Sequence, residues 1–421
     1  MADTGPSPPR PEKGTARVPH DAWAISVTSL FSDWSYEMIL PVLPFFLTLS
    51  LAATPFVVGL VDGAAQFAQS AVQPIAGERW ARGPRRRVRG AYGYLTTTIS
   101  HGLIAIAVSW PQVLVLRVGA WLGRGSRQPV KKAILAGATP SERQGASFGL
   151  EQAFDSAGAV LGTATAVTLL MLGGLGEFRT IFAVSVLPGF VAAAVLLIFV
   201  QDRAARSAAP GTPRRRTRWS ELPRRFRVFL LAEVVFGFGY FSILLALLRV
   251  GENLMPSAGG SLVGAIVAAL LLYLLYNLLF AGLSYPAGRW ADRAPGVGLI
   301  ALSFVLFAGV DALPIGGTGL LGGVLAFTVA GVQAGLQGVT ESAWVAREVP
   351  GPLVGPAFGW LGIVQGISVL GGSLLAGGLW TYSSAPLAFA VSGVLAVAGA
   401  VTLVPLARRA TPNGPLHASH S

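Results

Sequence analysis

Long apolar stretches follow one another along the chain, separated by short polar or glycine- and proline-rich breaks. A helix of about 20 apolar residues crosses a hydrocarbon core of about 30 Å. We therefore predict twelve transmembrane helices, at residues 22–49, 55–76, 88–108, 111–137, 146–172, 180–200, 226–248, 261–287, 297–313, 318–343, 357–379 and 385–406.

The longest internal polar interruption, residues 201–225, lies halfway along the chain. Together with polar ends at residues 1–21 and 407–421, it predicts two bundles of six helices, 22–200 and 226–406. A repeat at an offset of 210 residues supports this division, because Trp80-Ala81, Pro140, Gly145, Phe148-Gly149 and Gly162 recur as Trp290-Ala291, Pro350, Gly355, Phe358-Gly359 and Gly372. We expect an all-α membrane protein with two pseudo-symmetric halves.

Composition and charge agree with a membrane location. The chain is 53% hydrophobic and 12% charged, whereas soluble domains carry about 25% charged residues. The net charge of +12 comes largely from Lys and Arg in alternate connections, at 79–89, 124–143 and 214–227. By the positive-inside rule we expect a multi-pass protein of the inner (plasma) membrane with both termini in the cytoplasm. Its basic loops would contact anionic lipid, so nucleic acid is not needed to explain the charge.

Ionisable residues inside the predicted helices are costly, at about 2.5–3.5 kcal/mol for Asp, Lys or Arg near a helix centre. The first half carries eight of them, and the positions 210 residues later hold uncharged side chains. We therefore expect the frame to be duplicated and the ionisable chemistry to be confined to the first half. The eight residues are Asp33, Glu37, Asp62, Arg117, Arg124, Arg127, Glu151 and Asp155.

The four bases Arg117, Arg124, Arg127 and Lys131 recur at helical spacing and share one face of the fourth helix. Acids on the first, second and fifth helices are expected to meet this face. Lys131, Lys132 and Arg143, near the inner surface, are interpreted as snorkelling anchors. His101 is interpreted as a packing residue.

Asp33 and Glu37 stand one helical turn apart in an apolar segment. Two ionised carboxylates at this spacing repel each other, which favours groups that take up and release a proton in an aqueous cavity. We hypothesise that Asp33 and Glu37 carry protons and that Arg117, paired with Asp62, sets their affinity. The alternative is that these residues form buried ion pairs that only hold helices together.

Other polar residues are candidates for the wall of a substrate cavity. Gln66, Gln69 and Gln73 follow one face of the second helix, where they would line a pore or bond neighbouring helices. Asp155 and Gln365 are expected to face each other across the cavity. The full set of expected cavity residues is Tyr36, Gln66, Arg124, Glu151, Asp155, Tyr273, Asn277 and Gln365.

Enzyme chemistry receives little support from the sequence. Residues 145–149 fit the G-x-S-x-G pattern of a nucleophilic serine, but the repeat copy at 355–359 has no serine. The chain has no cysteine, and no P-loop or metal-spaced cluster is present. We expect neither an enzyme nor a bound metal or cofactor.

The twelve predicted helices in two related sets resemble the major facilitator superfamily over nearly the whole chain. The sequence GRWADR at 288–293 is similar to that family's loop signature, and GERWAR at 77–82 matches it except that Ala81 replaces the aspartate. The resemblance implies a cytoplasmic gate formed by Arg82, Asp292 and Arg293. It also implies that Arg117 corresponds to an arginine associated with proton coupling.

The fifth predicted helix is similar to the family's antiporter signature. Gly149, Gly158 and Gly162 have its glycine spacing, while Thr163 stands where the signature has proline. The resemblance implies a monomeric, proton-coupled secondary transporter that exports a small organic drug or metabolite by alternating access. The alternatives are an uptake symporter for a nutrient or chelate and, third, a membrane receptor or scaffold that transports nothing.

Overall fold

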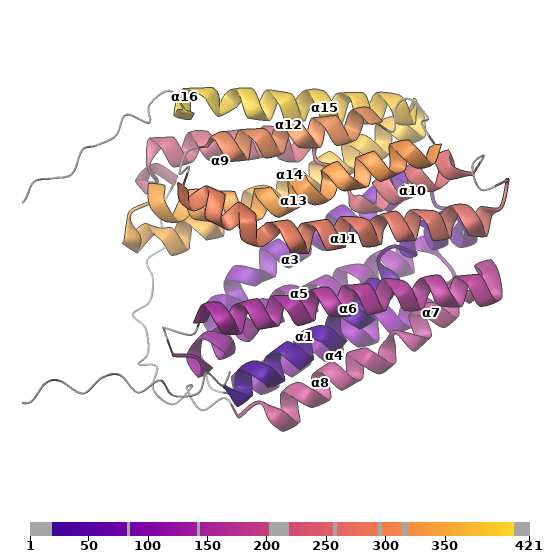
Figure 1. Cartoon of the computed structure of the whole chain (residues 1–421), viewed down its shortest axis with the longest axis horizontal. Helices are drawn as coiled ribbons and strands as arrows, with labels where there is room; N and C mark the ends of the chain where they lie inside the picture. The colour runs from indigo at the N-terminus through magenta and orange to yellow at the C-terminus, as the bar shows by residue number, and fades with distance from the viewer. Residues whose placement is uncertain are drawn as a thin grey trace, which may run out of the picture.

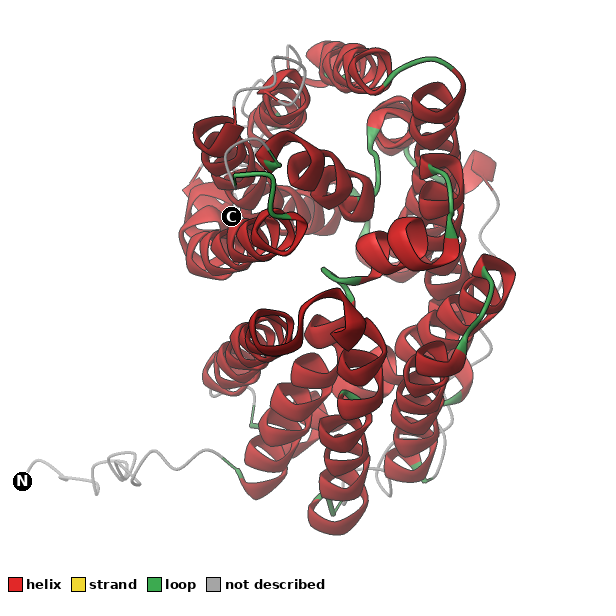
Figure 2. Ribbon diagram, turned by 90° about the vertical axis from the view of Figure 1, so that its right-hand side faces the viewer, coloured by secondary structure: helices red, strands yellow, loops and turns green. Residues whose placement is uncertain are grey.

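The computed structural model describes residues 19–81, 85–140, 144–201, 219–255, 259–293, 297–313 and 319–407. Within these ranges every regular element is a helix and none is a strand. Figure 1 shows the helices of the first and second halves of the chain as two groups that lie side by side, and Figure 2 shows the same described chain, turned by 90°, with helices as its regular elements.

The first half of the chain supplies the first six expected spans. Three of these spans consist of more than one helical segment, and the others are single helices. The elements are α1 (His20–Ile39), α2 (Leu43–Phe45), η1 (Phe46–Ser50), α3 (Pro55–Arg79), α4 (Arg86–Leu103), η2 (Ile104–Ile106), α5 (Trp110–Ala138), α6 (Gln144–Gly173), η4 (Gly174–Glu177), α7 (Phe178–Val184) and α8 (Val186–Phe199).

The second half supplies the other six spans. The seventh span consists of α9 and α10, and the twelfth ends in the short α16. The elements are η6 (Trp219–Glu221), α9 (Arg224–Gly239), α10 (Ile243–Leu254), α11 (Leu262–Arg293), α12 (Gly298–Ala312), α13 (Gly319–Glu348), α14 (Gly351–Tyr382), α15 (Ala385–Thr402) and α16 (Val404–Ala407).

Several spans expected as continuous helices are interrupted, including the sixth, where α7 and α8 are separated at Ser185, which corrects the sequence prediction. In the first span α1 ends at Ile39, next to Pro41 and Pro44, because proline lacks the amide hydrogen that would continue the helix. In the seventh span α9 ends at Gly239 and α10 begins at Ile243. Ser242, in this second break, caps α10 by accepting a hydrogen bond from the Leu244 amide at 3.1 Å.

Six helical stretches of the described chain are long and apolar enough to cross a membrane. They cover Ala146–Phe199, Arg224–Leu254, Leu262–Ser284, Gly319–Glu348, Leu353–Tyr382 and Ala385–Ala407. Helices α1, α3 and α5 fall outside this set, and they carry the buried charged residues Asp33, Glu37, Asp62 and Arg117. Their lower apolar content follows from the polar side chains that they direct into the protein.

The two halves repeat the same helix packing. In the first half α1 packs on α6 and α8, and α5 packs on α3 and α4. In the second half the matching helices pack in the same way, with α9 on α14 and α15, and α13 on α11 and α12. The fold is therefore a pair of pseudo-symmetric six-helix bundles, as expected from the repeat.

The bundles meet mainly along two helix pairs, α3 with α14 and α6 with α11, and α10 also contacts α2 and α3. The approach of α3 to α14 is closest far from the end that holds the start of α1 and the end of α16 (Figure 1). A Cβ atom on Gly59 would lie 2.3 Å from the carbonyl oxygen of Ser373, and one on Gly377 would lie 2.7 Å from that of Pro55. Only glycine permits this backbone contact.

Toward the end with the described termini the same surfaces separate. A Cβ atom added to Gly149 in α6, or to Gly359 or Gly362 in α14, would meet no atom within 4 Å. The described halves are thus in contact at one end and apart at the other.

Candidate functional site

A fully buried ion pair joins α5 to α3. Arg117 Nη2 lies 3.5 Å from Asp62 Oδ1, and the two side chains are 0% and 2% exposed. The guanidinium also lies 3.5 Å from the centroid of the Trp121 ring. Removing such a charge from water is costly unless it is paired, so each of these contacts offsets part of the cost of burying Arg117.

His101 lies beside this pair. Its Nε2 is 3.4 Å from Arg117 Nη1, and because arginine only donates, this nitrogen must accept. His101 Nδ1 is buried and has no hydrogen-bond partner among the described residues. His101 is buried as expected of a packing residue, but one of its two ring nitrogens has no hydrogen-bond partner among the described residues.

Two carboxylates of the first half bond to hydroxyl groups of the second half. Ser242 Oγ donates to Asp62 Oδ2 at 2.7 Å, and Tyr273 OH donates to Glu37 Oε2 at 2.9 Å. All four residues are buried. The interruption between α9 and α10 positions Ser242, and α11 positions Tyr273, so both bonds cross between the bundles.

Asp33 and Asp155 lie close together, on α1 and α6. Their carboxyl groups are within hydrogen-bonding reach of each other, and the charge of Arg124 acts on both. Arg124 lies 4.2 Å from the centroid of the Tyr36 ring, and its Nη1 is buried without a hydrogen-bond partner among the described residues. Arg124 thus lies within electrostatic range of three acids, Asp33, Glu37 and Asp155.

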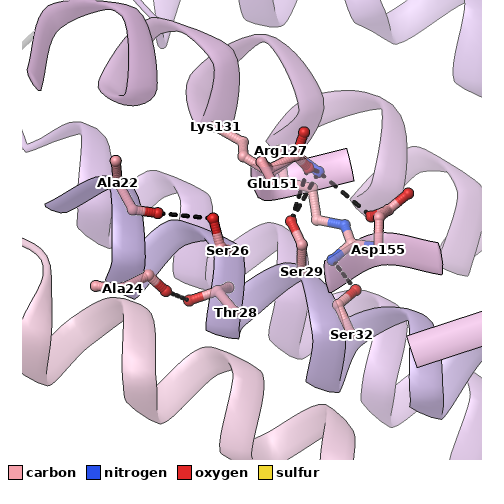
Figure 3. Close-up of polar contacts among 10 residues, drawn as sticks. All are labelled: Ala22, Ala24, Ser26, Thr28, Ser29, Ser32, Arg127, Lys131, Glu151 and Asp155. Carbon is pink, nitrogen blue, oxygen red and sulfur yellow. Dashed lines mark hydrogen bonds and ion pairs between the residues drawn. The ribbon is translucent and has the colours of Figure 1, made fainter. Parts of the chain in front are cut away.

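Figure 3 shows the inner part of this network around Lys131. Lys131 Nζ donates to Ser29 Oγ at 3.0 Å and to Glu151 Oε1, and it lies 3.8 Å from Asp155 Oδ1. Arg127 donates to Ser32 Oγ. Lys131 is only 9% exposed, so the expectation that it is a snorkelling anchor is wrong. The acids on the first-half helices do meet the basic face of α5, as the spacing predicted.

A second polar cluster lies in the other half, where the sequence analysis expected no ionisable group. Glu233 in α9 and Glu341 in α13 are 1% and 4% exposed. Gln365 Nε2 donates to Glu233 Oε2 at 3.1 Å and to Glu341 Oε2 at 2.8 Å. Asp311 in α12 is also buried. The ionisable chemistry is therefore not confined to the first half, which corrects that expectation.

A cavity of about 380 Å³ lies between the bundles, next to this second cluster. Its wall includes residues of α3, α9, α13 and α14, and it is lined on the first-half side by Gln66, Gln69, Ser70 and Gln73. Of the expected cavity residues, Gln66 and Gln365 line it. The opposite wall holds Glu233, Gln337, Glu341 and Gln365.

The other expected site residues lie behind or away from this wall. Asp155 does not line the cavity and has its ion-pair partner Lys131 in its own half, so it does not face Gln365, which lines the wall and bonds to Glu233 and Glu341. Asn277 lies close to Tyr273 in α11, and its Nδ2 is buried without a hydrogen-bond partner among the described residues. Arg293 is exposed at the end of α11. Arg82 and the side chain of Asp292 lie outside the described residues, so the gate stays a prediction.

Two of the three missed acids had a sequence signal, whereas Glu233, which lies 210 residues after Trp23, had none. Glu341 occupies the position 210 residues after Lys131, and Asp311 the position 210 residues after His101. These two acids therefore fall at polar positions of the first half. The correspondence is not general, because Asp33, Glu37, Asp62 and Arg117 correspond to apolar residues of the second half.

Two helical bundles with buried charges and a polar cavity between them define a polytopic membrane protein that can hold a polar solute at the bundle interface. A family model described as Major Facilitator Superfamily matches residues 25–322, and the chain belongs to this superfamily. Family and fold indicate a transporter and not an enzyme.

Relatives and solved structures agree with this assignment. An uncharacterized MFS-type transporter of Methanocaldococcus jannaschii is 28% identical over 387 residues, 91% of this chain and 94% of the relative. An uncharacterized protein of Mycobacterium tuberculosis strain H37Rv is 28% identical over 384 residues, 88% of this chain and 90% of its own length.

The fold is similar to that of several crystal structures. The nucleoside transporter NupG has a TM-score of 0.73 at 13% identity and covers 92% of this chain and 98% of its own. The D-xylose-proton symporter has a TM-score of 0.69 at 12% identity and covers 91% and 97%. At such low identity the likeness shows the fold alone.

Proposed function

We propose that the protein is a proton-coupled secondary transporter that exports a small organic compound by alternating access between its two six-helix bundles. The proposed bundles are residues 22–200 and 226–406, with a cytoplasmic linker at 201–225 and both termini in the cytoplasm. The observation that carries the proposal is the pair of bonds that cross between the bundles, from Tyr273 to Glu37 and from Ser242 to Asp62.

These bonds give a physical link between protonation and conformation. A hydrogen bond to an ionised carboxylate is about twice as strong as one between neutral groups. Protonation of Glu37 or Asp62 would therefore weaken the contact at the closed end and favour its opening. Arg117 is paired with Asp62, and Arg124 lies within electrostatic range of Glu37 and Asp155, so both bases lie beside the proposed proton carriers.

The cavity supports the binding half of the proposal. Its volume of about 380 Å³ falls in the range of about 300–1,000 Å³ that is usual for small-molecule sites. Uptake by proton symport is the second candidate, because the same carboxylates can couple transport in either direction. A monomer is sufficient for this mechanism, since each copy of the chain contains both bundles.

Transport by reconstituted protein tests the proposal. Candidate substrates are first found by thermal shift, because a ligand of the folded state stabilises it by mass action. In proteoliposomes we expect counterflow of a labelled hit without a gradient and accumulation when a proton gradient is imposed. Glu37→Gln should abolish gradient-driven accumulation and retain counterflow.

Tyr273→Phe is the matched variant, because it removes the same bond and keeps the carboxylate. It should retain accumulation at a reduced rate. If Glu37→Gln and Asp62→Asn both accumulate substrate like the unaltered protein, the proton assignment is wrong. If no hit shows counterflow, the protein does not act as a transporter and the receptor or scaffold alternative is favoured.

A further inference from the structure

The acid pair of the second half lies on the wall of the cavity, away from the ion-pair network of the first half. Gln365 holds one oxygen of each carboxyl group, Oε2 of Glu233 and Oε2 of Glu341. The remaining oxygens, Oε1 of both residues, are buried and have no partner at hydrogen-bond geometry among the described residues, although Gln337 lies near the Glu341 carboxyl group. Glu233 and Glu341 also lie within hydrogen-bonding reach of each other.

No basic side chain of the described residues is paired with these two acids. The neighbouring side chains on α13 and α14 are the neutral Gln337 and Gln365. Tyr240, directly after the end of α9, also lies within electrostatic range of Glu341.

Two carboxylates this close cannot both stay ionised in a buried site without a positive charge between them. A shared proton satisfies this requirement when the cavity holds only water. A cation satisfies it equally, and the two unpartnered Oε1 atoms supply the acceptors. The glutamine side chains along the rest of the wall provide neutral donors and acceptors for the remaining polar groups of a ligand.

We propose that Glu233 and Glu341 form the binding site for a small organic cation, carrying an amine or quaternary nitrogen, that competes with a proton for the same two carboxyl groups. This inference rests on the proposed function, whose substrate class and direction it specifies. The cavity volume accommodates a cation of metabolite or drug size and leaves room for its apolar part against Phe236 and Val369.

Competition at one site couples the two fluxes. When the cation enters the open end of the cavity, it displaces the shared proton to that side. After the bundles have rocked, a proton from the opposite side displaces the cation. One proton therefore moves inward for each cation that moves outward, provided that the open end faces the cytoplasm, and neither charge needs to cross alone.

Binding and proton release by the purified full chain in detergent test the inference without requiring transport. The probes are benzyltrimethylammonium and tetraphenylphosphonium, which carry a permanent charge, and benzyl alcohol is the neutral control. In weakly buffered solution with a pH indicator we expect about one proton released per bound cation where the pair holds one proton. At pH values where Glu233 and Glu341 share one proton, the apparent Kd for the cation should fall by about tenfold for each unit by which the pH rises.

Substitutions test whether Glu233 and Glu341 are responsible for cation binding and proton release. Glu233→Gln and Glu341→Gln should each weaken cation binding by at least about tenfold and abolish proton release. Asp311→Asn, which removes a buried acid of the same half that lines a different pocket, should retain both. Thermal unfolding of every variant checks that it is folded, and Glu341→Asp should keep part of the binding if Gln is poorly tolerated.

The outcomes separate this inference from the proposed function. Cation binding without proton release, equal binding of benzyl alcohol, unaltered binding by both glutamine variants, or failure of both cations to bind would each overturn the assignment. Cation binding with proton release in a protein that shows no counterflow would leave the site intact and refute the transporter proposal. Gradient-driven transport of neutral compounds alone would support the transporter proposal and refute the cation site.

Discussion

At the scale of single residues, the interior of the first half is organised around bases on one face of α5. Arg117 pairs with Asp62, Arg124 faces Asp33 and Asp155, and Lys131 bonds to Glu151. Each base reaches an acid on a different neighbouring helix. The network therefore fixes the relative positions of α1, α3, α5 and α6 as well as supplying titratable groups.

The Arg117–Asp62 pair should contribute much less to the free energy of unfolding than is lost when only one of its two residues is replaced. Arg117→Met leaves Asp62 buried beside only Ser242 and Gln66, so we expect a loss of about 3–5 kcal/mol in the free energy of unfolding. In the double variant Arg117→Met with Asp62→Asn, no unpaired charge is left, and the loss should be clearly smaller. Denaturant titration in detergent measures both.

Glu252→Gln is the control for this cycle. Glu252 forms a pair with Arg249 in which its side chain is 46% exposed, and exposed pairs contribute about 0–1 kcal/mol. A double variant as unstable as the sum of its two single variants would contradict the account, because it would show that Arg117 and Asp62 do not interact.

The sequence predicted these contacts because spacing on one helix is a local property. Arg117, Arg124 and Lys131 had to share a face of α5, and membrane burial required acids near that face. It did not predict that Tyr273 and Ser242 would bond to Glu37 and Asp62. Those bonds depend on how two bundles, far apart in the chain, are placed against each other, and local spacing carries no information about that placement.

At the scale of elements, glycines determine how closely the helices approach. In α6, a Cβ atom on Gly158 would lie 2.3 Å from the carbonyl oxygen of Leu30, and one on Gly162 would lie 2.6 Å from that of Trp34. The glycine spacing noted in the sequence therefore serves the packing of α6 on α1. This close contact brings Asp155 on α6 to Asp33 on α1.

The contact between the bundles can be tested at α3 and α14. Gly59→Ala would place a methyl group against the backbone of Ser373, which cannot move without shifting α14, so we expect a loss of about 1–3 kcal/mol in unfolding free energy. Gly362→Ala, on the open part of α14, should be neutral or stabilise by up to about 1 kcal/mol through helix propensity.

Thermal or denaturant unfolding in detergent compares the two alanine variants directly. Equal stability of Gly59→Ala and Gly362→Ala would mean that the bundles are not in contact at α3 and α14 as the structure has them.

The helix breaks after Ile39 and after Gly239 were not predicted from the sequence in full. Pro41 and Pro44 gave a signal for the first, but the break after Gly239 has no proline and depends on the contact of Ser242 with the other bundle.

At the scale of the whole molecule, the two halves share a frame and differ in charge. The first half holds acids and bases in ion pairs, whereas the central part of the second half holds Glu233 and Glu341 with glutamines and no base paired to them in the described chain. Twelve helices and the pseudo-symmetry could be predicted from apolar stretches and the 210-residue repeat. The division of labour between the halves could not, because it depends on which buried charges remain unpaired.

Inter-bundle distances measured by pulsed electron paramagnetic resonance test the central claim, that bonds to Glu37 and Asp62 hold one end of the molecule closed. The chain has no cysteine, so spin labels attach only at introduced ones. Leu49 and Tyr382 are exposed positions at the closed end, and Ile75 and Phe358 are exposed positions at the open end.

In lipid nanodiscs the variant Glu37→Gln with Asp62→Asn should lengthen the distance between labels at positions 49 and 382 and shorten that between labels at positions 75 and 358, relative to the same labels in the unaltered protein. The variant Glu252→Gln should change neither distance. Unchanged distances in the double variant, or changes of the same sign at both ends, would contradict alternating access controlled by these two carboxylates.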